Sequence, residues 1–130
     1  MGKARPRTLV LDRGALIALE RGDERVRALF RVAIASERRV VIPAGVLGQV
    51  FRGGSRQVAL RALLAAPTVD VPPLDRVLAE GAGMLCARSQ TSDVIDACVV
   101  LHAQREPSLV LTSDGSDLRR LDPELALELV

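Results

Sequence analysis

Short apolar runs alternate with longer amphipathic segments along this chain. Residues 8–11 and 40–42 are apolar without alternation, a pattern typical of strands buried on both faces of a sheet. Similar runs predict strands at residues 68–71 and 109–111 and an edge strand at residues 126–129. Between these runs, apolar side chains recur at helical spacing and predict helices at residues 14–20, 23–36, 43–52, 56–66, 74–88, 93–104 and 117–121.

Strands that alternate with helices predict a three-layer α/β/α sandwich with a central parallel sheet. The 130 residues contain no internal repeat or linker, so we expect a single domain over residues 1–130. Ala, Val and Leu dominate the apolar positions, with two Phe and no Trp or Tyr. The scarcity of aromatic side chains argues against a surface that binds single strands by stacking rings on bases.

Charge and cysteine content narrow the class of protein only a little. The formal net charge of +2 is too mild to establish nucleic-acid binding. All but one of the 18 basic side chains are Arg, the better phosphate ligand, although a coding bias explains the same preference. Cys86 and Cys98 lack metal-site spacing and are expected to be buried thiols. Residues 1–7 are basic without an apolar leader, and no stretch is long enough to span a membrane, so we expect a cytoplasmic protein.

Five aspartates stand where predicted strands end or where helices begin. Asp12 closes the first apolar run, Asp93 and Asp96 open a later helix, and Asp114 and Asp117 follow the next strand. The carboxyl ends of parallel strands meet at one edge of a sheet, where α/β domains place their sites. Carboxylates gathered there repel one another unless a cation neutralises them, and Mg²⁺ and Mn²⁺ prefer oxygen ligands. The pattern therefore indicates a metal-dependent enzyme of phosphodiester chemistry.

Asp93 and Asp96 belong to the same predicted helix, but an ordinary structural role is available to explain only one of them. Asp93 has the position of an ordinary helix N-cap, and that explanation and a role in the site remain equally open. Asp96 lies further along, between Ile95 and Ala97 in a segment that otherwise has the pattern of a buried helix. An unpartnered carboxylate among apolar neighbours is costly, so a cation beside Asp96 is the better explanation.

Four short motifs occur in order along nearly the whole chain. The first is Leu9-Val10-Leu11-Asp12 followed by residues 15–19, and the second spans residues 41–53. The third is residues 93–97, and the fourth combines residues 111–114 with residues 117–121. Together they resemble the motifs of a PIN domain, and specifically of a VapC-type toxin ribonuclease from a type II toxin–antitoxin system.

The resemblance implies a function, a cofactor and partners. The catalytic, metal-binding positions fall on Asp12, Asp96 and Asp114. The accessory positions fall on Gln49, Asp93, Thr112 and Asp117. Bound Mg²⁺, or Mn²⁺ in its place, would lower the pKa of a water and stabilise the leaving oxygen when a phosphodiester is cut. The implied substrate is tRNA, rRNA or mRNA, and the implied partners are a cognate VapB-type antitoxin and a second copy in a homodimer.

The chain departs from the family's pattern at two places. Gln49 stands where members carry Glu, and an amide offers a metal only a neutral oxygen. Two readings follow: a nuclease with weakened metal binding, or a degenerate domain that binds RNA or an antitoxin without cutting. Arg13 and Gly14 replace the small hydroxyl residue that follows the first aspartate. A cation at Arg13 could compete with the metal or bind substrate phosphate, and Arg119 is a second candidate for phosphate.

A response-regulator-like domain is a third class that gathers acids at strand ends. That class needs a lysine at the end of a late strand, whereas the only lysine of this chain is Lys3. The sequence therefore disfavours it.

Overall fold

The structure, a computed structural model, describes residues 8–130; residues 1–7, expected to contain no leader, lie outside the described part. Five short strands form one parallel sheet in the order β3-β2-β1-β4-β5. The strands are β1 (Thr8–Leu11), β2 (Val40–Val41), β3 (Val69–Asp70), β4 (Ser108–Thr112) and β5 (Leu127–Leu129). Each predicted strand is present, and β5 is an edge strand as expected.

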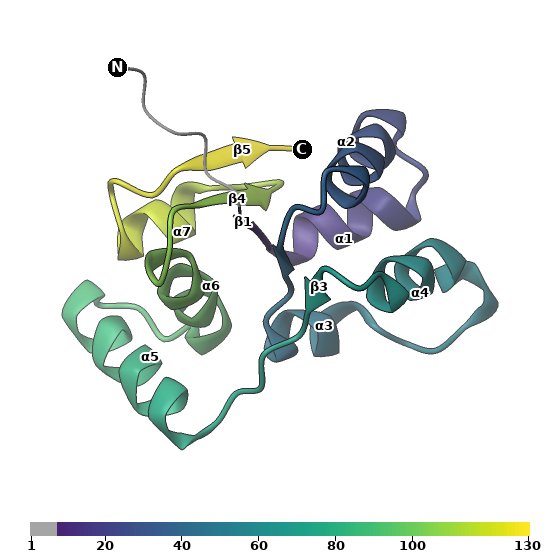
Figure 1. The fold of residues 1–130 in the computed structure, drawn as a ribbon. Helices are drawn as coiled ribbons and strands as arrows, with labels where there is room; N and C mark the ends of the chain where they lie inside the picture. The colour runs from purple at the N-terminus through teal and green to yellow at the C-terminus, as the bar shows by residue number, and fades with distance from the viewer. Residues whose placement is uncertain (1–7) are drawn as a thin grey trace, which may run out of the picture.

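Helices cover both faces of this sheet. They are α1 (Arg13–Glu20), α2 (Glu24–Ala35), α3 (Ala44–Val50), α4 (Val58–Ala65), α5 (Arg76–Ser89), α6 (Val94–Gln104) and α7 (Ser116–Leu121). Figure 1 shows α1 and α2 on one side of the sheet and α6 and α7 on the other, with α5 packed outside α6. The predicted three-layer α/β/α sandwich is therefore confirmed.

The helix predicted to run towards Gly53 ends earlier, at Val50. The side-chain carbonyl of buried Gln57 accepts hydrogen bonds from the backbone N–H groups of Arg52 (2.8 Å) and Gly53 (3.0 Å). Its amide donates to the carbonyl of Val50 (2.8 Å). This one side chain thus satisfies backbone groups that would otherwise pair within a longer helix. Gln57 itself ends a short 3₁₀ turn, Ser55–Gln57, that precedes α4.

The core is aliphatic, as the composition predicts. All four residues of β1 are buried, and so are the last three of β4. Cys86 and Cys98 are buried free thiols, in agreement with expectation. None of the helices described within residues 8–130 combines the length and the hydropathy that crossing a membrane requires.

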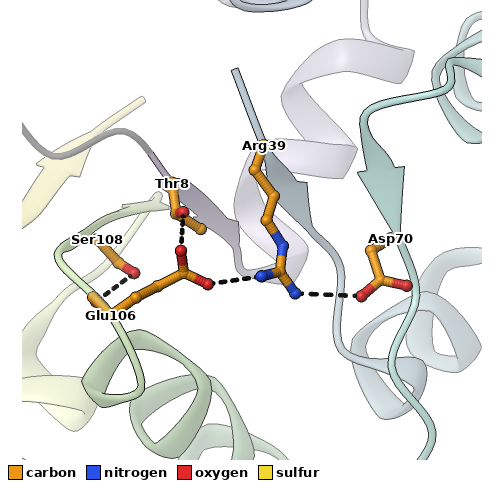
Figure 2. A network of polar contacts seen from close by, with 5 residues as sticks. All are labelled: Thr8, Arg39, Asp70, Glu106 and Ser108. Carbon is orange, nitrogen blue, oxygen red and sulfur yellow. Dashed lines mark hydrogen bonds and ion pairs between the residues drawn. The ribbon is translucent and has the colours of Figure 1, made fainter. Parts of the chain in front are cut away.

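Polar contacts link residues of β1 and β3 to the residues that precede β2 and β4 (Figure 2). Glu106, in the loop before β4, accepts a hydrogen bond from Thr8 of β1 (2.8 Å) and pairs with Arg39, which precedes β2 (2.7 Å). Arg39 also lies 3.4 Å from the carboxylate of Asp70 in β3. Largely exposed ion pairs contribute less than about 1 kcal/mol each. Their value here is to fix strand order at the edge opposite the aspartates.

Candidate active site

The register of the two central strands brings Asp12 and Thr112 together. Leu11 of β1 is paired with Leu111 of β4, so the next residue of each chain segment stands at the same carboxyl edge. The Thr112 hydroxyl donates to Asp12 Oδ2 at 2.9 Å, and the backbone N–H of Arg13 donates to Asp12 Oδ1 at 2.8 Å. Asp12 is only 7% exposed, and these two bonds hold its carboxylate in one orientation.

Helix α6 runs against the strands, so its first turn starts at the same edge. Asp93 is its N-cap, because Asp93 Oδ1 accepts a hydrogen bond from the backbone N–H of Asp96 at 2.9 Å. The capping role considered for Asp93 is therefore present in the structure. Asp96 lies in the first turn, half-buried.

The loop between β4 and α7 supplies the remaining carboxylates. Asp114 Oδ1 accepts hydrogen bonds from the backbone N–H (3.0 Å) and the hydroxyl (2.9 Å) of Ser116. These bonds favour the charged form and lower the pKa of Asp114 from its ordinary value. Asp117 follows in the first turn of α7. Both side chains are thus at the carboxyl edge, and Asp114 stays ionised at neutral pH.

A small polar cavity of about 60 Å³ lies where these segments meet, and we name it the acid cavity. One water takes up about 30 Å³ in the liquid, so there is room for an ion and a water molecule. Its polar lining is Asp12, Arg13, Asp96, Thr112, Ser113, Asp114 and Asp117. The structure therefore gathers the three aspartates predicted as metal ligands, and both Thr112 and Asp117, around one cavity.

Asp96 carries the strongest electrostatic strain in this group. Burial raises its pKa to about 7, helped by the negative charges of Asp93, Asp12 and Asp117, while Arg13 acts in the opposite direction. A carboxyl group that resists ionisation at neutral pH is one that a cation would stabilise. The charge balance of the acid cavity thus suits a bound cation.

The oxygen atoms of the acid cavity are of the type that binds a hard divalent ion, but they are not spaced to bind one. Carboxylate and hydroxyl oxygens are the ligands that Mg²⁺ and Mn²⁺ prefer. As the side chains stand, however, residues 8–130 contain no group of three or more His, Cys, Asp or Glu placed to hold a metal ion. Like charges repel without a cation, so the carboxylates would have to turn inward to share one.

Three predicted site residues do not line the acid cavity. Gln49 is exposed on α3, and its backbone carbonyl accepts a hydrogen bond from Arg52 Nη2 (3.2 Å). Asp93 acts at a distance, through the cap and through its charge on Asp96. Arg119 lines a neighbouring cavity, which shares Ser113 and Asp114 with the acid cavity.

Sequence reasoning missed the close packing of Gly14 on Ser113. A Cβ atom at Gly14 would lie 2.6 Å from the backbone nitrogen of Ser113, closer than real Cβ contacts. Glycine at position 14 therefore lets the loop after β4 lie directly on the start of α1. The only signal in the sequence was a glycine in the first turn of a helix, just after Asp12.

Residues 9–123 match the family model of the PIN domain. The chain belongs to the PIN domain family, and the resemblance noted in its motifs is confirmed. PIN domains are generally nucleases and typically bind divalent metals. Among curated proteins, none matches the chain in sequence.

Solved structures share the fold at low sequence identity. A structure of VapBC2 from Rickettsia felis, bound to a DNA fragment from its promoter, matches with a TM-score of 0.69 and 15% identity over 95% of this chain and 98% of that chain. FitAcB from Neisseria gonorrhoeae matches with a TM-score of 0.62 and 18% identity over 92% and 95%. At these identities the likeness establishes the fold.

Proposed function

We propose that this protein is a Mg²⁺-dependent endoribonuclease and the toxin of a VapBC-type toxin–antitoxin pair. The observation that carries the proposal is the acid cavity at the carboxyl edge of a PIN-domain sheet. Four aspartates line it, and one of them resists ionisation. Mn²⁺ is expected to substitute for Mg²⁺, because both take oxygen ligands.

Each residue of the acid cavity has a separate task in this proposal. Asp12, Asp96 and Asp114 would hold the ion, which when bound supplies an activated water and charge for the leaving oxygen. The Thr112 hydroxyl orients Asp12 through their hydrogen bond. Arg13 lines the cavity and its charge acts on Asp96, while among residues 8–130 no hydrogen bond or ion pair engages its guanidinium. It is therefore available for the phosphate of the RNA.

The test is cleavage of RNA by the purified chain with Mg²⁺, with Mn²⁺ and with EDTA. Cleavage that needs the metal is expected. If RNA binds at saturating metal but is never cut, the domain is a binding module, the alternative that Gln49 raises. The acid cavity favours an active enzyme, because Gln49 does not line it and all the carboxylates that do line it are present.

An apolar groove between α1, α2 and α4 supports an antitoxin partner. The groove has a volume of about 410 Å³, and its floor includes Leu19, Phe30 and Leu63. Among residues 8–130, Arg27 and Arg31 are the only charged side chains that line it, and Arg27 Nε is buried without a hydrogen-bond partner there. An acidic amphipathic helix would fill the groove with its apolar face and satisfy Arg27 with a carboxylate. The similarity in fold to VapBC2 and FitAcB is consistent with such a partner.

Arg27→Ala is expected to weaken binding of this partner by about 10- to 100-fold, since a hydrogen bond between charged groups contributes about 1.5–3 kcal/mol. Calorimetry with the product of the reading frame next to this gene measures the change. Arg25→Ala is the matched control, because Arg25 lies on the same helix, outside the groove. Equal losses in the two variants would show that only net charge matters.

We also propose a homodimer, supported by apolar side chains that α5 leaves uncovered. Val77 is 80% exposed and Met84 is 62% exposed on this helix. Exposed apolar groups that lie on one element favour a protein–protein contact. Light scattering should give twice the chain mass of 13.9 kDa. A monomer at micromolar concentration would contradict this proposal.

A further inference from the structure

A second cavity, of about 320 Å³, adjoins the acid cavity on the side of α7 and β5, and we name it the α7–β5 cavity. The two cavities share Ser113 and Asp114. Figure 1 shows α7 and β5 as neighbours at the end of the chain. A ligand in the α7–β5 cavity would therefore lie next to anything held by the aspartates.

The floor of the α7–β5 cavity is aliphatic and partly uncovered. Leu127 and Leu129 are two apart on β5, so their side chains project from the same face of the strand. Leu129 is 55% exposed. A Cβ atom at Gly115 would lie 2.7 Å from Leu127 Cδ2, which shows how closely the loop before α7 packs against this strand. This part of the cavity wall is therefore apolar and closely packed.

Polar groups surround this floor, and one of them has unused donors. Ser113, Ser116 and Arg119 line the cavity. Within residues 8–130, no hydrogen bond or ion pair engages the guanidinium of Arg119, although the carboxylates of Asp114 and Asp117 are on the same loop and helix. Five N–H groups are thus available to a ligand that lies on Leu127 and Leu129.

We propose that the α7–β5 cavity binds one unpaired nucleoside of the RNA, next to the phosphate that is cut. The base lies on Leu127 and Leu129, and Arg119 donates to its polar edge. The volume is at the lower end of small-molecule sites, which suits one nucleoside. Proteins that read RNA bases take them from loops and ends, where the base is unstacked. This inference rests on the proposed function, and it makes the substrate a single-stranded segment of a folded RNA.

Binding of RNA hairpins tests the inference without needing cleavage. With Ca²⁺ in place of Mg²⁺, fluorescence anisotropy measures affinity for a hairpin with a single-stranded loop and for a duplex of the same sequence. We expect the hairpin to bind more tightly. Arg119→Ala should weaken it about tenfold or more, as expected for lost hydrogen bonds to a charged group. Arg120→Ala is the control, because Arg120 is the exposed neighbour on α7 and lies outside the cavity. Its effect should stay within about twofold, because an exposed charge outside the cavity contributes little.

An abasic residue moved through the loop separates base recognition from phosphate recognition. One position should weaken binding to the wild type as much as Arg119→Ala does, and should cause no further loss in that variant. If no abasic position matters, or if Arg119→Ala and Arg120→Ala lose equally, the nucleoside site is wrong.

The two proposals fail in distinguishable ways. RNA that binds through Arg119 but is never cut with Mg²⁺ would overturn the nuclease and keep the nucleoside site. RNA cut normally by Arg119→Ala would overturn the site and keep the nuclease. A chain that binds no RNA would overturn both.

Discussion

Asp96→Asn is expected to lower RNA cleavage strongly and yet to raise the melting temperature of the metal-free protein at pH 8. The acid cavity loses one of the charges that would hold the ion, so cleavage should fall by on the order of 10²–10³, the scale seen when a group that stabilises transition-state charge is removed. The substitution also removes a negative charge that burial and the charges of three neighbouring aspartates destabilise in the folded state. Screening reduces that gain to about 1–2 kcal/mol, or roughly 3–8 °C.

The effect of Asp96→Asn on stability should depend on pH in a defined direction. The pKa of Asp96 is about 7 in the folded protein and near 3.8 when unfolded. Well below pH 3.8 the group is protonated in both states and contributes nothing. Between pH 4 and 7 only the unfolded state gives up its proton, so the wild type loses stability as pH rises, and the loss is complete above pH 7. Melting curves of the two proteins should converge as pH falls below 3.8 and diverge towards pH 8.

The pH dependence of Mg²⁺ binding is a second measure of the ionisation of Asp96. In the proposed metal site the ion needs a charged Asp96, so affinity for Mg²⁺ should rise as pH approaches 7 and level off above it, with release of a proton. Asp75→Asn is the matched control, since Asp75 caps α5 away from the acid cavity and asparagine caps a helix equally well. A lower melting temperature for Asp96→Asn at every pH would identify Asp96 as a structural hydrogen-bonding residue instead.

The sequence predicts the layers of the fold because short apolar runs alternate regularly with segments of helical spacing. The apolar run at β1 is buried throughout, and the spacing of Val26, Phe30 and Ala33 gives the buried face of α2. Helix ends are less predictable where a distant side chain decides them. Gln57 ends α3 through bonds to the backbone, and nothing in the local pattern of residues 44–53 reveals this.

Much of the candidate site is predictable, because strand ends and helix starts must meet at one edge of a parallel sheet. Asp12, Asp96 and Asp114 follow from that rule, and the register of β1 and β4 adds Thr112. The exposure of Gln49 could not be predicted in this way. A motif identifies the residue, but it does not show which side of α3 faces solvent.

The α7–β5 cavity is also invisible in the sequence. It exists because β5 returns to the sheet beside β4 and because the loop at Gly115 packs closely on Leu127. Both are contacts between segments separated in sequence, and the local pattern of each segment does not reveal them. Arg119 likewise looks like an ordinary basic residue in the last turn of α7 until the cavity beside it is known.

Gly14→Ala is expected to lower both stability and cleavage, although alanine is the better helix former. A Cβ atom there would lie 2.6 Å from the nitrogen and 2.7 Å from the Cβ of Ser113, so the backbone of the loop must move. Forcing extra volume into a packed contact costs about 1–3 kcal/mol. Ser113 stands between Thr112 and Asp114, so the same movement displaces two residues of the acid cavity. A shift of about 1 Å in such a site can reduce the rate about 10²-fold.

Gly83→Ala is the control that isolates the contact from the helix preference. Gly83 lies within α5, and a Cβ atom there meets nothing within 4 Å. The substitution should therefore stabilise the protein by about 0.5–1 kcal/mol and leave cleavage unchanged. Thermal melts and Mg²⁺ titrations of both variants give the comparison. A Gly14→Ala protein as stable as Gly83→Ala would mean that the loop after β4 does not rest on α1.

The changes in stability caused by Asp96→Asn and Gly14→Ala have opposite signs, which distinguishes an effect of charge from an effect of position. Asp96→Asn removes a repelled charge, so cleavage should fall while the metal-free fold becomes more stable. Gly14→Ala leaves every charge in place and moves the loop, so cleavage and stability should fall together. Added Mg²⁺ should recover part of the stability lost in Gly14→Ala, because an ion that binds only the folded state draws the carboxylates together. It should recover little in Asp96→Asn, where one of the proposed ligands is missing.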